Sequence, residues 1–202
     1  MRSYICIDGQ ITELASEQVL AITNLLPTQS VELSSVAIGD TVKIGPHEMV
    51  VLEQHGEATS LIKKGLLSEC RFGTRNNYNG SYADERCNRF ASEIADAVGV
   101  DNMILFTVDL TSNDGLKDYG IVDRRVSLLT ADQYRRYVAV LDMHKPDGWW
   151  WLATPFSTPT HLNHRNVLCV SPSGFIDYGG YDDYDCGVRP FCILKSNIFV
   201  SK

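Results

Sequence analysis

The composition of this 202-residue chain is that of a folded globular protein, because 44% of its residues are hydrophobic and only 21% are charged. Its formal net charge of -7, and basic clusters no larger than a pair such as Lys63 and Lys64, argue against a general affinity for nucleic acid. The first residues, MRSYICIDGQ, lack the apolar core of a signal peptide, and no apolar run reaches the length of a membrane span. We therefore expect synthesis in the cytosol and no membrane insertion.

Residues 1–35 are expected to form a small N-terminal αβ appendage and a linker. SYICI predicts a short strand, Asp8-Gly9 a turn, and the following residues an amphipathic helix capped near Thr12. The apolar positions of that helix are Leu14, Val19, Ile22 and Leu25. The segment LPTQSVELSS has no sustained period and is typical of a linker, so the main domain, residues 36–202, is expected to begin near Val36.

The main domain is predicted to mix helices and strands. DTVKIGPHEMVVLEQ predicts two strands about a Gly45-Pro46 turn, and ATSLIKK predicts a third. SYADERCNRFASEIADAVG predicts a helix that ends at Gly99, and a second helix begins after Thr130. GWWWLAT, NVLCV and GVRPFCIL predict short strands. This order indicates an α+β fold with two helices, short antiparallel strands and much irregular loop. The first helix places on one face the residues Cys87, Phe90, Ile94 and Val98.

Four motifs, in the order in which they occur, resemble a C-type-lectin-fold family of phage and gut-bacterial proteins. They are VAIGDTVKIGPHEMVVLEQ, VSLLTADQYRRY, WWWLATPFS and GVRPFCIL. That family overlaps the variable proteins of diversity-generating retroelements and is distantly related to the formylglycine-generating enzymes. The resemblance covers about Val36 to Val200. It implies that Trp150, Trp151 and Leu152 pack in the core and that Gly187 to Pro190 form a closing strand. Three consecutive Trp residues are costly to expose, so at least two are expected to be buried. Arg189 in an apolar strand needs a buried carboxylate or a backbone carbonyl as its partner.

The family's variable proteins are diversified by mutagenesis at adenines, which suggests a test on residues 161–185. An Asn codon mutated only at its adenines reaches every amino acid except Lys, Glu, Gln, Met and Trp. None of these five types occurs in the window, although they supply 28 of the other 177 residues. A window chosen in advance would be empty by chance about once in seventy trials, judged against the chain's own composition.

The same window is rich in Asn, Asp, His and Tyr, whose codons are one or no base change from Asn. With Arg165, these residues form the predicted binding surface: His161, Asn163, His164, Arg165, Asn166, Asp177, Tyr178, Tyr181, Asp182, Asp183, Tyr184 and Asp185. The scaffold residues expected between them are Val167, Val170, Gly174 and Phe175, and the varied segment is expected to end at Gly187.

The chemistry of the predicted binding surface favours recognition. Tyr supplies large contact area at a small entropic cost, and Asp, Asn and His supply directional hydrogen bonds. Tyr181 and Tyr184 are the expected anchors, and Gly179 and Gly180 are expected to let the loop bend. A solvated acidic turn with incidental tyrosines is the plain structural alternative. Calcium is a second alternative, with oxygen ligands from Asp177, Asp182, Asp183 and Asp185.

Catalysis is not expected. His161 and His164 lack a third ligand for an iron or zinc triad, and the motifs of the phosphate loop, the nucleophile elbow and the zinc proteases are absent from the sequence. The formylglycine-generating relatives use a cysteine pair, but the sequence around Cys186 and Cys192 does not reproduce theirs. The six cysteines show no C-x-x-C pair and read as small buried hydrophobes: Cys6, Cys70, Cys87, Cys169, Cys186 and Cys192. We expect no cofactor.

These observations predict a ligand-binding or receptor-binding protein with a diversifiable loop surface. The resemblance implies host-receptor recognition by a phage, with the protein carried in the virion, as in a tail fibre, and adhering to an unknown host-surface protein or glycan. The bacterial cell surface is the alternative location. Residues 1–35 are candidates for attachment to the virion or for homo-oligomer formation. The alternative functions are a calcium-dependent carbohydrate-binding module and a structural virion protein without a variable ligand.

Overall fold

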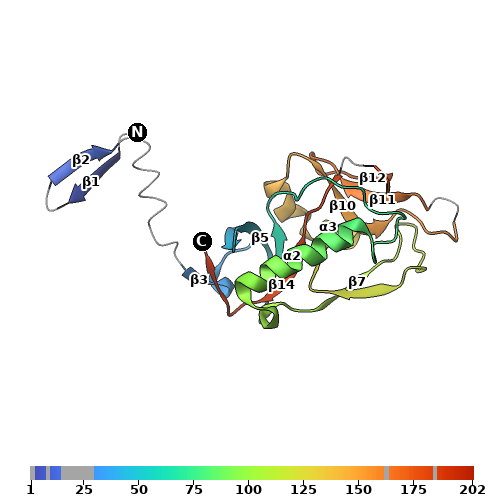
Figure 1. The fold of residues 1–202 in the computed structure, drawn as a ribbon, viewed down its shortest axis with the longest axis horizontal. Coiled ribbons are helices and arrows are strands. Elements are labelled where there is room, and N and C mark those ends of the chain that lie inside the picture. The colour runs from blue at the N-terminus through green and yellow to red at the C-terminus, as the bar shows by residue number, and fades with distance from the viewer. Residues whose placement is uncertain (1–2, 8–9, 15–29, 162–163, 184–185) are drawn as a thin grey trace. The chain divides into compact units, whose positions relative to one another are not determined.

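The structure is a computed structural model that describes residues 3–7, 10–14, 30–161, 164–183 and 186–202 (Figure 1). It divides the chain into two compact units, residues 1–30 and 31–202. Val31 to Ser35, which the sequence assigns to the linker, belong to the second unit, because the N–H groups of Leu33 and Ser34 donate to the carbonyls of Ile198 and Ser196. Leu33 is also fully buried in the core.

The first unit contains an antiparallel hairpin of β1 (Ser3–Ile7) and β2 (Gln10–Leu14). The predicted helix start at Thr12 is therefore wrong, because Thr12 pairs with Ile5 and Leu14 pairs with Ser3. The β-branched residues Ile11 and Thr12, close to a partner strand, favour the sheet over the helix. The rest of the predicted helix, with Val19, Ile22 and Leu25, lies outside the described residues.

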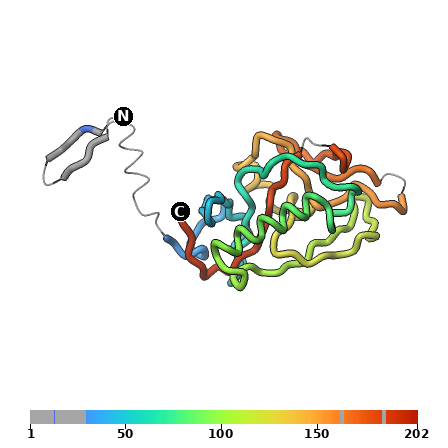
Figure 2. Tube along the Cα trace, in the orientation of Figure 1, coloured from blue at the N-terminus to red at the C-terminus, as the bar shows by residue number. Residues whose placement is uncertain are grey.

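A seven-stranded sheet forms one layer of the second unit. The Gly45-Pro46 turn between β4 (Thr41–Ile44) and β5 (His47–His55) is confirmed, and so is the third predicted strand, β6 (Ala58–Lys63). The C-terminal strand β15 lies between β3 and β4, and Figure 2 shows this red segment beside the blue one that contains β3. The order of the sheet is β3 (Ser30–Glu32), β15 (Phe199–Ser201), β4 (Thr41–Ile44), β5 (His47–His55), β6 (Ala58–Lys63), β14 (Phe191–Lys195) and β9 (Val126–Ser127).

A four-stranded sheet carries the predicted binding surface. β10 and β11 pair antiparallel, β11 and β12 pair antiparallel, and β13 pairs parallel with β10, so β12 is an edge strand. Its order is β12 (Ile176–Gly180), β11 (Asn166–Val170), β10 (Trp149–Pro155) and β13 (Cys186–Gly187). A separate hairpin is formed by β7 (Phe106–Asp109) and β8 (Ile121–Arg124). Short 3-10 turns occur at η1 (Leu33–Ser35), η2 (Val100–Asn102) and η3 (Asp142–His144).

Two helices are present among the described residues, both as the sequence predicts. In α2 (Tyr82–Val98), the Ser81 side chain accepts from the Asp84 N–H, and Gly99 ends the helix with a φ of 84°. α3 (Ala131–Leu141) begins with a capping box between Thr130 and Gln133. The chain thus has an α+β fold.

The Trp run connects two hydrophobic clusters of the described residues. Trp151 is buried in the cluster that includes Phe90 of α2, whereas Trp150 is buried in the cluster that includes Tyr134 of α3. This division follows from strand geometry, because successive side chains point to opposite faces. Trp149 is 36% exposed, so the expectation of at least two buried Trp residues is confirmed.

Arg189 has the backbone partners that the sequence allows for. Its Nε donates to the Lys63 carbonyl (2.9 Å), and its Nη2 donates to the carbonyls of Lys64 (3.2 Å) and His144 (2.7 Å). Its guanidinium also lies over the ring of Trp150, 5.2 Å from the centroid. The predicted closing strand over residues 187–190 is only partly correct, because a gap separates β13, which ends at Gly187 in the four-stranded sheet, from β14, which begins at Phe191 in the seven-stranded sheet. Pro190, with no N–H group, suits this gap.

Candidate functional site

The outer strand of the four-stranded sheet brings the two halves of the predicted binding surface together. Asn166 at the start of β11 pairs with Gly180 at the end of β12. Beyond this pair, the Tyr181 N–H donates to the Arg165 carbonyl (3.0 Å). Residues 164–166 and 177–183 therefore lie side by side, and their exposed side chains share this edge of the sheet. Asn163, Tyr184 and Asp185 lie outside the described residues.

An ion pair links these two segments. Asp182 Oδ1 accepts from Arg165 Nε at 3.2 Å and from Arg165 Nη2 at 3.0 Å. The hydrogen bond from Arg165 holds the pKa of Asp182 below its usual value. Because the side chains are 64% and 44% exposed, solvent screens their attraction and the pair contributes little to stability. Both groups are therefore available to a ligand at small cost.

A tight turn fixes the backbone next to this ion pair. The Asp183 N–H donates to the Gly180 carbonyl (3.0 Å), and the Gly180 N–H donates to Asp183 Oδ2 (2.7 Å). The Asp183 carboxylate is thus used within the protein. The carboxylate of Asp177 is exposed on β12, and its Oδ1 accepts from the adjacent Tyr178 N–H (2.8 Å).

The tyrosines of the predicted binding surface have different roles. Tyr178 is 53% exposed and packs its ring against Phe156, with 4.8 Å between the ring centroids. Tyr181 is partly buried and packs against the core that contains Trp151. Tyr178 is therefore the more exposed of the two rings, whereas Tyr181 supports the fold.

The loop that carries His161 is anchored by acidic residues that the sequence analysis missed. Asp114 Oδ2 contacts His161 Nδ1 at 2.9 Å and accepts from Ser157 Oγ at 2.7 Å. Hydrogen bonds, the strongest of them from Ser112, hold the pKa of Asp114 well below its usual range. The neighbouring Asp118 accepts from the hydroxyls of two threonines in the same loop, Thr158 and Thr160. Two Asp residues among Ser, Asn and Gly in TSNDGLKDYG mark a structured polar loop, but its partner lies about 40 residues away and cannot be read from the sequence.

Two expectations, one about the glycines and one about the scaffold, are corrected by the structure. Gly179 and Gly180 do not bend a loop, because both lie in β12. A Cβ at Gly179 would approach the Trp151 ring to 3.2 Å, so this glycine permits close packing. Phe175, expected to be scaffold, is 70% exposed because it lies in the turn between β11 and β12.

The other scaffold positions are buried or constrained. Val167 and Val170 lie in the core, and Gly174 has a φ of 93°, which favours glycine. A Cβ at Gly187 would lie 2.9 Å from Leu66 Cδ1, so only glycine fits without a shift of Leu66. His161 and His164 are exposed, as the sequence predicts.

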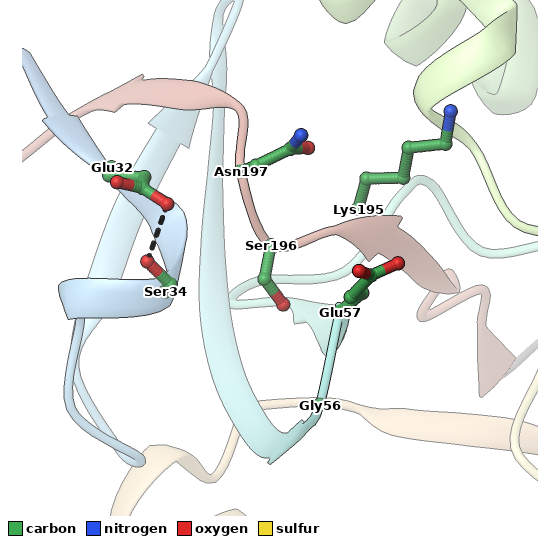
Figure 3. A pocket seen from close by; sticks show the side chains of 7 residues that line it. All are labelled: Glu32, Ser34, Gly56, Glu57, Lys195, Ser196 and Asn197. Carbon is green, nitrogen blue, oxygen red and sulfur yellow. Dashed lines mark hydrogen bonds between the residues drawn. The ribbon is translucent and has the colours of Figure 1, made fainter.

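The described residues contain no group of three or more His, Cys, Asp or Glu side chains placed to hold a metal ion. Cys186 and Cys192 are both buried, and burial raises the pKa of the Cys192 thiol to about 12. A cavity of about 320 Å³ lies elsewhere, between the η1 segment and the turn before β6, and is lined by Glu32, Ser34, Gly56, Glu57, Lys195, Ser196 and Asn197 (Figure 3). None of these residues belongs to the predicted binding surface.

Comparisons with protein-family models, with curated proteins and with solved structures found no match to this chain. In the part of the chain that the structure describes, no helix is long and apolar enough to cross a membrane.

Proposed function

We propose that this protein binds a ligand or receptor through the predicted binding surface, centred on Tyr178 of β12. The observation that carries the proposal is that exposed Tyr, Asp, Arg and His side chains gather on an edge strand and its adjoining loops while the strand behind them is buried. β11 is buried from Val167 to Val170, and Gly179 lies against Trp151. Exposed side chains on such a support can change without disturbing the core.

The side chains of the surface suit recognition. Tyr178 offers a large ring that Phe156 already holds in place, so little entropy is lost when a ligand packs on it. Arg165 and Asp182, in the segments that adjoin β11 and β12, and Asp177 of β12 add exposed charged hydrogen-bonding groups of both signs. An aromatic anchor surrounded by adaptable polar groups is the usual composition of a binding hot spot.

The composition of the window supports the proposal only at its exposed positions. The stretch without Lys, Glu, Gln, Met or Trp extends beyond the window, from Leu152 to Leu194. Much of that stretch is buried strand, where Lys, Glu and Gln are rare for energetic reasons alone. The informative positions are therefore the exposed ones, such as His161, His164, Asp177 and Tyr178.

The resemblance to the variable proteins of diversity-generating retroelements supports a more specific proposal. In this proposal the chain has a lectin-like fold, is a component of a phage virion, and recognises a receptor on the host cell. A location on the bacterial cell surface is the alternative. The ligand would be a host-surface protein or glycan, bound without catalysis. A calcium-dependent carbohydrate-binding module would use the carboxylate of Asp182, which Arg165 now engages. A structural virion protein would bind no such ligand.

Binding to cells tests the site. The labelled full-length chain is titrated onto a panel of gut-bacterial strains by flow cytometry, with Tyr178→Ala as the site variant. Tyr82→Ala is the matched control, because Tyr82 is 43% exposed at the start of α2. We expect Tyr178→Ala to weaken binding by about tenfold or more and Tyr82→Ala to leave it unchanged. Equal binding by both variants would contradict the site, and loss of binding in a chelator would favour the calcium-dependent module.

Nucleotide sequence tests diversification separately. We expect a near-copy of the codons for residues 161–190 beside the gene, and sibling isolates that differ from it only at adenines. An unvaried surface among siblings, with no such copy, would leave the structural virion protein as the better proposal.

A further inference from the structure

Two buried cysteines that lie far apart in the sequence face each other across a short strand contact. An isolated antiparallel bridge joins Glu69 to Gly187, which places Cys70 opposite Cys186. The Cys70 N–H donates to the Cys186 carbonyl at 3.1 Å, so the two backbones are still paired at this position. Both residues carry thiols in this structure and are about 95% buried.

The backbone geometry of this pair suits a disulfide. Residues that face each other at a hydrogen-bonded position of an antiparallel pair have Cα atoms about 5.5 Å apart. That separation is close to the preferred Cα separation of a disulfide, about 5.5–6 Å. Facing residues also project their side chains to the same side of the pair. In agreement, Cys70 and Cys186 belong to the same hydrophobic cluster, which also contains Trp151.

We propose that Cys70 and Cys186 form a redox-sensitive disulfide that fastens the C-terminal end of the predicted binding surface. This inference does not depend on the proposed function, because the bond can be detected without any ligand.

The oxidant in this reaction is a small disulfide such as oxidised glutathione. The Cys70 thiolate attacks one glutathione sulfur, which forms a mixed disulfide and releases the first glutathione thiolate. The Cys186 thiolate then attacks the Cys70 sulfur and releases the second. The protein loses two electrons and two protons, and one oxidised glutathione becomes two reduced glutathiones.

The surroundings of Cys70 make it the entry point for the oxidant. Burial raises the pKa of its thiol, and the positive charges of Arg86 and Arg89 partly oppose that rise. The adjacent residues Ser68 and Glu69 line an open groove of about 770 Å³. We therefore expect slow oxidation at neutral pH and faster oxidation at higher pH.

The disulfide would act on the predicted binding surface through the backbone. The segment after Cys70 already contacts it, because the Gly73 N–H donates to the Tyr181 carbonyl at 3.1 Å. Cys186 follows directly on residues 181–185 in the sequence. A covalent bond at Cys70 would fix Cys186 to the same segment that Tyr181 contacts through Gly73. A binding surface that is ordered in advance loses less entropy when it binds.

Peptide mapping tests the proposal on the full-length chain. The reduced protein is incubated with oxidised glutathione at pH 8.5. It is then denatured in the presence of N-ethylmaleimide, which blocks the remaining thiols, and digested with trypsin and chymotrypsin without reductant. Cleavage after Phe191 separates Cys186 from Cys192. We expect a peptide that joins Cys70 to Cys186, and a rise of about 1 M or more in the urea midpoint, because the bond closes a long loop.

Variants separate this bond from other thiol chemistry. Cys186→Ala should abolish the joined peptide and the rise in the urea midpoint, whereas the matched control Cys192→Ala, also at a buried thiol, should keep both. If Cys186→Ala does not fold, the joined peptide of the unaltered chain still decides the question. Alkylation of Cys70 and Cys186 as separate thiols, a Cys70–Cys87 link, or a stable mixed disulfide with glutathione at Cys70 would each overturn the proposal.

Discussion

Replacement of Arg189 by Met removes a buried positive charge and three hydrogen bonds at once. The guanidinium is 1% exposed and has only backbone carbonyls as hydrogen-bond acceptors among the described residues. Burial lowers the pKa of Arg189 from 12.5 to about 10, which corresponds to a cost of about 3 kcal/mol for keeping the charge inside. Loss of three hydrogen bonds to a charged donor costs about 2 kcal/mol each.

The hydrogen bonds should therefore outweigh the burial cost, and we expect Arg189→Met to lower the free energy of unfolding by about 3 kcal/mol. Arg189→Lys keeps the charge but has a single donor group, which cannot reach all three carbonyls, so it should lose an intermediate amount.

Urea denaturation followed by Trp fluorescence measures both effects, since Trp150 lies beneath the guanidinium. The matched control is Arg136→Met, because Arg136 is 62% exposed and its ion pair with Glu53 contributes about 1 kcal/mol or less. An Arg189→Met variant as stable as the unaltered chain would refute the reasoning. It would show that the free-energy cost of burying the charge is at least as large as the stabilisation from its three hydrogen bonds.

Three further changes probe other parts of the fold, each by urea denaturation. Gly179→Ala should destabilise the protein by about 1–3 kcal/mol because its Cβ would press on Trp151, and an unchanged midpoint would show that β12 can move away. Thr130→Ala should lose about 1 kcal/mol with the capping box, and a neutral result would mean that packing alone fixes the start of α3. Burial raises the pKa of Cys87 and of Cys192 from 9.0 to about 12, so both thiols lose their protons first in the unfolded chain. Each thiol should therefore lower stability by about 1 kcal/mol between pH 9 and 10, after full stability well below pH 9, and Cys192→Ala should lose about 1 kcal/mol less over that interval than the unaltered chain.

Local sequence signals predicted the elements that depend on local physics. The Thr130 cap, the Gly99 end and the Gly45-Pro46 turn all rest on neighbouring residues, and all three are confirmed. The predicted helix start at Thr12 failed because a nearby strand offers a competing partner, which periodicity alone does not reveal.

The candidate site was predictable only in part, because its support comes from distant segments. Composition indicated Tyr178 as an exposed polar-loop residue, but its packing on Phe156 required the fold. The fold was also required to show that Asp114 contacts His161, 47 positions away in the sequence, and that Gly179 packs against Trp151. Composition can indicate the exposed polar residues of a candidate site, but it does not indicate the distant residues that support them.

The strand order of the seven-stranded sheet also constrains how the protein can be made. β4 pairs with β15, which joins Lys43 to Ser201, and β6 pairs with β14, which joins Leu61 to Cys192. At ordinary translation rates of about 5–20 residues per second, β4 and β6 are made roughly 7–30 s before these partner strands. During that interval the nascent hairpins expose two open edges, which are templates for pairing with neighbouring chains. Slower initiation or a chaperone on the ribosome should therefore raise the soluble yield, because either one keeps the open edges of neighbouring chains apart.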